Sequence, residues 1–201
     1  MLEAWRSLAA TAFARLLGCG WRQAAVAGAA LLAACSTPRE TFDFSATAAA
    51  PRLGHGALVA VAEPSAPAEI DSNRFLVRGE NGDLNYLSDA QWADTLPRLV
   101  QARLRDMIDA HGARAVRPGD VASFHLDTEL RRFEIDASRQ IAAVEIVARL
   151  SKGGGGAPFA EGVFSGEEPA PHTLGPDAAR AYEGAMNQAT ERLALWVRKR
   201  I

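Results

Sequence analysis

The chain is poor in cysteine. Among its 201 residues there are two, Cys19 and Cys35, and both lie within the first 35 positions. The remainder of the chain therefore has no internal disulfide and no thiol site. A domain of this length buries enough apolar surface to fold without a covalent crosslink, so the shortage of cysteine does not argue against an exported protein.

The chain also lacks a strong excess of either charge, and its formal net charge is -2. Residues 1–34 contain Arg6, Arg15 and Arg22 against Glu3, so the rest of the chain carries 19 basic and 23 acidic side chains. A nucleic-acid partner normally requires a dense basic face, so this balance excludes one. The hydrophobic content of 48% is that of an ordinary globular domain.

No apolar run is long enough to span a bilayer as a helix. Residues 24–34 read AAVAGAALLAA, about the length of a signal-peptide core. The run ends in Leu32-Ala33-Ala34-Cys35, which is similar to the bacterial lipobox of one aliphatic residue, two small residues and cysteine. Small side chains let the signal peptidase reach the bond before Cys35. The sequence predicts a lipoprotein signal peptide over 1–34 and lipidation of Cys35 with fatty acyl chains such as palmitate.

Two other interpretations of this segment are an ordinary signal peptide and a buried Ala-rich helix with a chance cysteine. The position of the run and its small residues favour the lipobox. Each buried CH₂ of an acyl chain contributes about 0.8 kcal/mol, so three chains hold a protein on a bilayer. Ser36 follows the cysteine, where Asp retains lipoproteins in the inner membrane of enterobacteria-like systems. We therefore expect the outer membrane, with the inner membrane as the alternative.

After the cysteine, residues 35–56 are rich in Ser, Thr, Ala, Pro and Gly, which predicts a lipidated N-terminus and tether. Within them, Phe42-Asp43-Phe44 alternates and is compatible with a short first strand. Residues 57–201 are predicted to form one domain. Alternating or short apolar runs predict six strands there, at 58–62, 73–78, 84–87, 121–135, 140–150 and 158–167.

Two details of the strand pattern predict local features of the sheet, namely a bulge and the face that packs on the core. The alternation slips at Arg131-Arg132, which predicts a bulge or bend in a long strand. In the next strand the even-numbered face, Ala142 to Leu150, is the more apolar and is predicted to face the core. Asn81-Gly82 and the run Gly153 to Gly156 mark hairpin turns.

Two amphipathic helices are predicted. The first follows a capping-box pattern of Ser88 and Gln91, includes Trp92 on its apolar stripe, and ends at a left-handed Gly112. The second is capped by Asp177 and keeps an apolar stripe to Val197. The predicted fold class is α+β, an antiparallel sheet with two amphipathic helices packed on one face.

The sequence offers no recognisable catalytic or metal site. The histidines are dispersed and lack metal-ligand spacing; they are His55, His111, His125 and His172. The glycine run lacks the Lys and Ser/Thr of a phosphate loop, and no Gly-x-Ser-x-Gly pattern is present. Acidic pairs such as Glu134 and Asp136 are interpreted as solvated charge. We therefore predict no enzymatic activity, no metal and no cofactor.

Candidate partner contacts come from aromatic and basic residues. Arg74 and Arg78 share a strand face and suit either an acidic partner or a plain exposed sheet face. Trp92 and Trp196 suit either core packing or contact with a partner or lipid.

The hairpin RFLV…LNYL followed by QWAD and LPRL resembles the ABC-type transport auxiliary lipoprotein family. In that family an aromatic residue closes a strand, a Trp opens the helix, and leucine spacing follows. Tyr86, Trp92, Leu96 and Leu104 match these positions, and the resemblance covers roughly 57–200. A Tyr-x-Leu-Pro signature often follows the anchor in relatives, and Phe42-Asp43-Phe44 lacks its Tyr and Pro.

The resemblance implies an accessory part of an MCE transport system, which carries lipids between the inner and outer membranes. The implied partners are an MCE-domain periplasmic protein and, through it, an ABC permease and ATPase; self-association into a homo-oligomer is also compatible. The contact residues predicted are Arg74, Arg78, Tyr86 and Trp92. Two other functions stay open: an assembly lipoprotein that chaperones or plugs an outer-membrane barrel, and a periplasmic enzyme or small-ligand binder.

Overall fold

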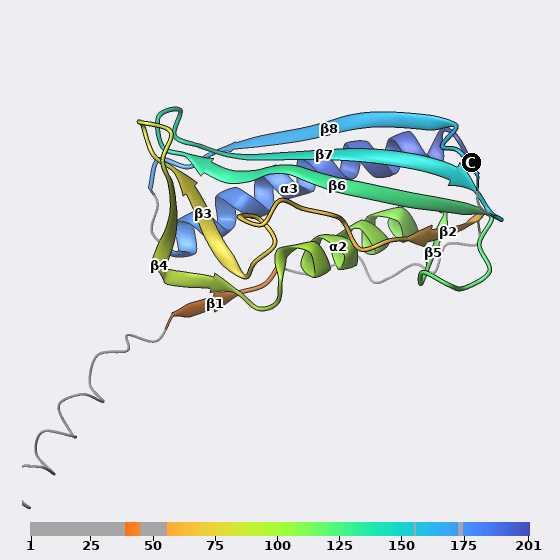
Figure 1. The fold of residues 1–201 in the computed structure, drawn as a ribbon, viewed down its shortest axis with the longest axis horizontal. Helices are drawn as coiled ribbons and strands as arrows, with labels where there is room; N and C mark the ends of the chain where they lie inside the picture. Colours follow the sequence, from red (N-terminus) through yellow and green to blue (C-terminus); the bar gives the residue numbers. More distant parts are fainter. Residues whose placement is uncertain (1–38, 45–55, 155, 173–174) are drawn as a thin grey trace, which may run out of the picture. The chain divides into compact units, whose positions relative to one another are not determined.

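The computed structural model describes residues 39–44, 56–154, 156–172 and 175–201 (Figure 1). These residues belong to one unit, Arg39–Ile201. The predicted signal peptide, Cys35 and much of the predicted tether lie outside the described residues. The elements are β1 (Glu40–Phe42), β2 (Leu58–Val61), β3 (Arg74–Arg78), β4 (Leu84–Trp92), α2 (Leu96–Ala110), β5 (Arg114–Val116), β6 (Phe124–Asp136), β7 (Ile141–Lys152), β8 (Ala160–Pro169) and α3 (Gly175–Arg198).

The centre of the sheet is the long strand β6. On one side β6 pairs antiparallel with β7, which pairs antiparallel with β8. On its other side β6 pairs in parallel with β2 near Phe124 and with β3 near Asp136, and a bridge between Ser65 and Glu129 lies between the two. Beyond them β5 joins β2, and β4 and β1 extend from β3.

The predicted α+β class is confirmed, and the sheet is mixed rather than antiparallel throughout. The parallel pairs of β2 with β5 and β6 arise because α2 carries the chain back along the sheet, so that β5 and β6 run in the direction of β2; β1 also pairs in parallel, with β4. β5 was not predicted. It has three residues, too few for alternation to show in the sequence.

Helix α3 packs on β6, β7 and β8, while α2 packs on α3, β2 and β5. Figure 1 shows α3 lying behind β7 and β8. The inner face of β7 is the predicted even-numbered one, and its members are buried: Ala142, Val144, Ile146, Ala148 and Leu150.

Helix α3 begins at Gly175, so Asp177, the predicted cap residue, lies in the first turn of the helix instead. None of the helices among the described residues has the length and apolarity to cross a membrane.

The predicted irregularity in β6 is confirmed. The pairing with β7 shifts register between Leu130 and Arg132. Before the shift the even-numbered side chains face the core, as at Leu130, and after it the odd-numbered ones do, as at Phe133 and Ile135. The extra residue therefore turns Arg132, Glu134 and Asp136 together onto the outer face of the sheet.

The predicted start of the first helix was wrong. Ser88 to Trp92 continue strand β4, and α2 begins at Leu96, after Thr95 at its N-cap position. Strand pairing explains the extension, because Trp92 N–H donates to the carbonyl of Asn73 (2.7 Å) on one side and Ala93 N–H donates to that of Phe42 (2.7 Å) on the other. The predicted left-handed Gly112 is confirmed, with φ of 96°.

An aromatic cluster joins the first strand to the rest of the unit. Trp92 is 1% exposed and lies 4.0 Å from Phe75 between ring centroids; Phe44 packs on Trp92 at 4.9 Å. Phe133 stacks on Tyr182 at 4.9 Å. The Tyr182 hydroxyl donates to the carbonyl of Leu76, and burial raises the pKa of this hydroxyl. Residues 39–44, inside the segment predicted as tether, are thus packed on the domain.

Candidate functional site: the outer face of the sheet

Strands β3 and β4 bring two of the predicted contact residues together. The Arg74 guanidinium carbon lies 4.6 Å from the centroid of the Tyr86 ring, a cation–π arrangement. The Tyr86 hydroxyl donates to the carbonyl of Glu69 at 3.2 Å, and Tyr86 remains 36% exposed. This pair presents a cation and an aromatic ring on the surface.

Arg78 lies further along β3 and forms an ion pair with a buried carboxylate. Its Nε and Nη2 donate to the two oxygens of Glu134 at 2.9 and 2.8 Å. Glu134 also accepts from Arg132 Nε at 2.7 Å, and Arg132 Nη2 donates to Asp136 at 2.9 Å. The bulge in β6 between Leu130 and Arg132 places Arg132, Glu134 and Asp136 on the face of the sheet that Arg78 also occupies.

The environment keeps both carboxylates ionised. Burial acts to raise the pKa of Glu134, whose side chain is 4% exposed, but hydrogen bonds from Arg78 and Arg132 outweigh burial and hold that pKa below its usual value. The hydroxyl of Ser138 donates to Asp136 at 2.6 Å and, with Arg132, lowers the pKa of that carboxyl. Two cations and two anions thus neutralise one another, which describes a structural network rather than an acid–base pair.

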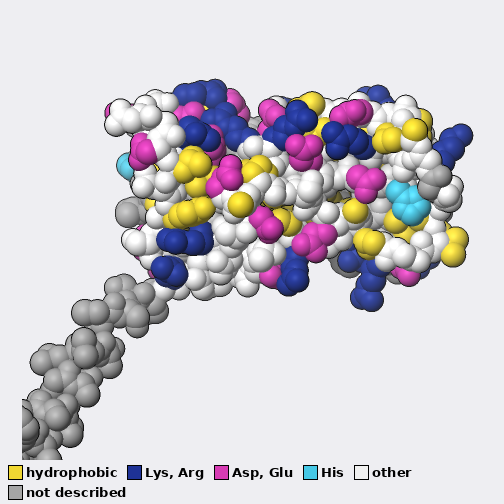
Figure 2. All heavy atoms as spheres, in the orientation of Figure 1, with side chains coloured by type: hydrophobic (Ala, Val, Ile, Leu, Met, Phe, Trp, Pro, Cys, Tyr) yellow, Lys and Arg dark blue, Asp and Glu magenta, His cyan; other side chains and the backbone are white. Residues whose placement is uncertain are grey.

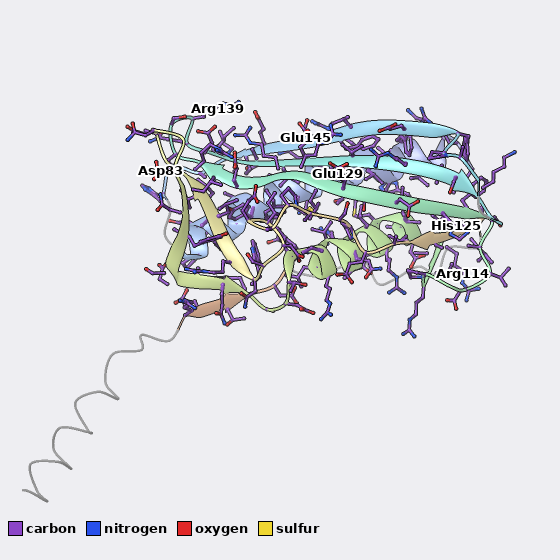
Figure 3. All side chains as sticks on the ribbon, in the orientation of Figure 1. Asp83, Arg114, His125, Glu129, Arg139 and Glu145 are labelled. Atoms are coloured by element: carbon purple, nitrogen blue, oxygen red, sulfur yellow. The ribbon has the colours of Figure 1, made fainter. Side chains whose placement is uncertain are left out.

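A surface pocket of about 310 Å³ lies over this network. Its lining is largely ionic and comprises Glu69, Ile70, Leu76, Arg78, Arg131, Arg132, Glu134 and Glu145. Figure 3 labels Glu145 on β7 and Glu129 on the neighbouring strand β6. Further along these strands Arg149 bridges Glu129 (3.6 Å) and Glu161 (3.3 Å). Figure 2 shows basic and acidic side chains interspersed on this side of the molecule.

The structure separates the four predicted contact residues. Arg74 and Tyr86 touch, and Arg78 lies on the same strand as Arg74 but is committed to Glu134. Trp92 lies in the core at the end of β4 and takes no part in this surface. Cys35, the predicted lipidation site, is outside the described residues. Within residues 39–44, 56–154, 156–172 and 175–201, no three His, Cys, Asp or Glu side chains are placed to hold a metal.

Sequence reasoning was wrong about Glu134 and Asp136, which were interpreted as solvated charge. They are 3% and 7% exposed. A phase slip at Arg131-Arg132 immediately before two acidic residues at alternate positions indicates that cations and carboxylates share one face.

The family model described as ABC-type transport auxiliary lipoprotein component matches residues 41–194. The chain belongs to this family. The match begins within β1 and ends within α3, so it spans almost all of the described unit, and the resemblance seen in the sequence is confirmed.

Solved structures share the fold of this auxiliary lipoprotein. The crystal structure of a Xanthomonas campestris protein of the DUF330 family is 28% identical, with a TM-score of 0.64, covering 82% of this chain and 93% of that one. The crystal structure of an uncharacterized protein superposes with a TM-score of 0.67 at 10% identity, covering 80% and 99%.

A relative among curated proteins is an uncharacterized protein of Bradyrhizobium diazoefficiens, 36% identical over 83 residues. The alignment covers 39% of this auxiliary lipoprotein and 22% of the Bradyrhizobium protein, so it spans less than a quarter of that relative's length.

Proposed function

We propose that this auxiliary lipoprotein is held at the outer membrane by acyl chains on Cys35 and docks the periplasmic MCE-domain component of an ABC-type lipid transport system. The observation that carries the proposal is the family match over residues 41–194, directly downstream of the lipobox Leu32 to Cys35. A lipid anchor close to a folded docking domain is the arrangement that holds the far end of a transport complex at a membrane. The protein itself would catalyse no reaction.

The described surface supports docking better than catalysis. Its buried ionic groups are paired with one another, at 2.7 to 2.9 Å between Glu134, Asp136 and their arginines. A general acid or base needs a pKa near the working pH, whereas the pKa of each of these carboxyls is lowered. These groups shape the sheet face without being poised for proton transfer.

Arg74 and Tyr86 are the proposed contact residues on this face. Arginine and tyrosine are enriched in protein interfaces because each combines a large contact area with directional hydrogen bonds. Arg78 supports the contact by holding β3 against β6 through Glu134, and Trp92 supports β4 from the core.

The test is purification of the tagged full-length protein from detergent-solubilised membranes of its host. We expect mass spectrometry to find an MCE-domain protein with its permease and ATPase, and an acylated N-terminal cysteine at position 35. Arg74→Glu should lower recovery of the MCE-domain protein about tenfold, which corresponds to about 1.4 kcal/mol. Glu80→Arg, at the exposed β3–β4 turn, is the control for a change of charge.

Cys35→Ser should leave the protein out of the outer-membrane fraction. Recovery of an outer-membrane barrel instead of an MCE-domain protein would support the alternative function in barrel assembly. An unmodified N-terminus in the membrane-bound protein would contradict lipid anchoring.

A further inference from the structure

The end of the Arg39–Ile201 unit opposite β1 is formed where several elements start or finish. Leu58 of β2 pairs with Arg114 of β5, Val59 pairs with Phe124 of β6, and Phe124 pairs with Lys152 of β7. Figure 1 shows β5, the β7–β8 turn and the C-terminus of α3 at this end, and Figure 3 shows Arg114 and His125 there. We call the segments 114–127, 152–154, 156–159 and 198–200 the distal end.

Ring contacts tie these segments together. Phe124 and Phe159 lie 6.1 Å apart between ring centroids. At the C-terminus of α3, Trp196 packs on Phe164 of β8 at 5.3 Å, and the Arg200 guanidinium lies 4.4 Å from the Trp196 ring. The end of the helix is therefore packed against β8, and Figure 1 shows it at the same end of the unit as the β7–β8 turn.

The distal end is basic although the chain is acidic. Its segments contain two acidic side chains, Asp120 and Asp127, and six basic ones: Arg114, Arg117, Lys152, Arg198, Lys199 and Arg200. Residues 35–201 as a whole carry 19 basic and 23 acidic side chains. These segments together therefore carry a net positive charge, which attracts an acidic partner.

Apolar side chains are exposed among these cations. Val121 is 89% exposed and Phe159 is 46% exposed. From β5 to β8 the surface crosses four strand spacings, about 19 Å, which is within the size of an ordinary protein interface. An exposed aromatic ring at the same end of the unit as these cations suits a protein segment that carries carboxylates beside an apolar side chain.

The length of chain before β1 fixes which end lies nearest to the anchor. Five residue steps join Cys35 to Glu40 and reach at most about 18 Å when fully extended. Helix α3 begins beside β1, where a Cβ on Gly175 would lie 3.4 Å from the Phe42 ring, and its 24 residues extend about 36 Å to the distal end. The linker is therefore about half as long as the helix, and the distal end is the part of the unit furthest from the residue where the linker joins it.

We propose that the distal end is a docking surface for an acidic segment of a periplasmic protein. The inference rests on the proposed function for the lipid anchor and names a face distinct from Arg74 and Tyr86. A protein partner is favoured over the anchoring membrane because the β1 end is the end held at the lipid. The exposed Val121 and Phe159 contact the partner's apolar side chain, and the lysines and arginines around them pair with its carboxylates.

The experiment is site-specific photo-crosslinking in cells that make the full-length protein. The crosslinker p-benzoylphenylalanine replaces Phe159 or Val121 at the distal end, or the exposed Asp89 of β4 near β1, and mass spectrometry identifies the crosslinked peptide. We expect Phe159 and Val121 to crosslink to acidic peptides of one periplasmic protein, and Asp89 to give no such product.

Charge reversal tests the electrostatic part. The triple change Lys152→Glu, Lys199→Glu and Arg200→Glu should lower the yield of crosslinking from Val121 about tenfold. The matched control alters the net charge equally away from the distal end, through Arg39→Glu, Arg98→Glu and Arg180→Glu, and should leave the yield unchanged. Thermal unfolding of both triple variants checks that each is folded.

Crosslinks to lipid, to a second copy of this chain, or to neutral or basic peptides would overturn the inference, as would absence of any product or an equal effect of the two triple variants. Failure of the proposed function has a different signature. If the MCE-domain protein is recovered by affinity purification but crosslinks only through Asp89, the distal surface is wrong and the function stands. If the acidic peptide belongs to a protein outside an MCE system, the surface stands and the function is wrong.

Discussion

At the scale of single residues, Glu134 determines how the outer face of β6 is held. It is almost fully buried and accepts hydrogen bonds from Arg78 of β3 and Arg132 of its own strand. β3 and β6 pair over two residues only, Val77 with Ile135 and Arg78 with Asp136. The side-chain ion pair therefore reinforces a short backbone ladder.

Replacing Glu134 with Gln should lower the free energy of unfolding by about 1–3 kcal/mol. Breaking a buried ion pair leaves an uncompensated charge, and the partial exposure of the Arg78 and Arg132 side chains, 40% and 31%, relieves part of the cost. Urea unfolding at neutral pH measures the difference. Glu161→Gln, which removes a solvent-exposed partner of Arg149, is the control and should change stability by less than about 0.5 kcal/mol.

The Glu134→Gln variant should also change how the free energy of unfolding depends on pH. Glu134 and Asp136 have pKa values below those of the unfolded chain, so their stabilisation is present above the unfolded values, about 4.3 and 3.9, and is lost as pH falls through the folded ones. Stability should be level from neutral to about pH 5 and decline below about pH 4. The decline should be shallower in the Glu134→Gln variant; an identical slope would contradict the assignment.

At the scale of elements, β8 is an edge strand held closely against α3. Two side chains of the helix donate to its backbone: Arg192 Nη1 to the carbonyl of Ser165 (2.6 Å) and Gln188 Nε2 to that of Glu167 (3.0 Å). These contacts occupy edge carbonyls that would otherwise be open to another strand. Helix α3 can lie this close to β8 because the residue between Ser165 and Glu167 is glycine. A Cβ on Gly166 would lie 2.0 Å from the carbonyl oxygen of Ala185.

Gly166→Ala should therefore destabilise the fold by about 2–3 kcal/mol, because the helix must move away from the strand to admit one methyl group. Thermal or urea unfolding measures the loss. Gly156→Ala is the matched control, since a Cβ there meets nothing within 4 Å. Equal stability of the two variants would show that α3 and β8 are less closely packed than described.

At the scale of the whole molecule, the position of β1 sets how many residues separate Cys35 from the folded unit. Phe42 packs on Phe75 at 5.6 Å and Phe44 on Trp92 at 4.9 Å, so the linker after Cys35 ends at Arg39 rather than near residue 56. With the proposed lipidation of Cys35, the β1 end is the attached end of the unit, which is the basis for proposing the distal surface.

Replacing Phe42 and Phe44 together with Ala should release β1 from β4 while the rest of the domain stays folded. Hydrogen exchange of the Thr41 and Phe42 amides should become at least about tenfold faster, because losing two partly buried rings costs more than about 1.4 kcal/mol. Mass-spectrometric hydrogen exchange makes the measurement, with β7 peptides as the internal reference. Unchanged exchange at β1, or acceleration throughout β7, would contradict this account.

The sequence alone determined the features that depend on neighbouring residues. The β7 face, the shift near Arg131 and the left-handed Gly112 followed from periodicity and local motifs, and the family was indicated by the resemblance of residues 57–200. The lipobox at Cys35 is local too, and lipidation there stays a prediction.

Tertiary structure decided the rest, because strand partners are chosen by residues far apart in the sequence. Backbone pairing with Asn73 and Phe42 keeps the segment at Trp92 in a strand, where a helix was predicted. Glu134 is buried because folding brings it beside Arg78 of β3, which neutralises its charge. The distal end is likewise a product of folding: Arg114, Phe159 and Arg200 are scattered along the chain, and the strand ends and the end of α3 bring them to the same end of the unit.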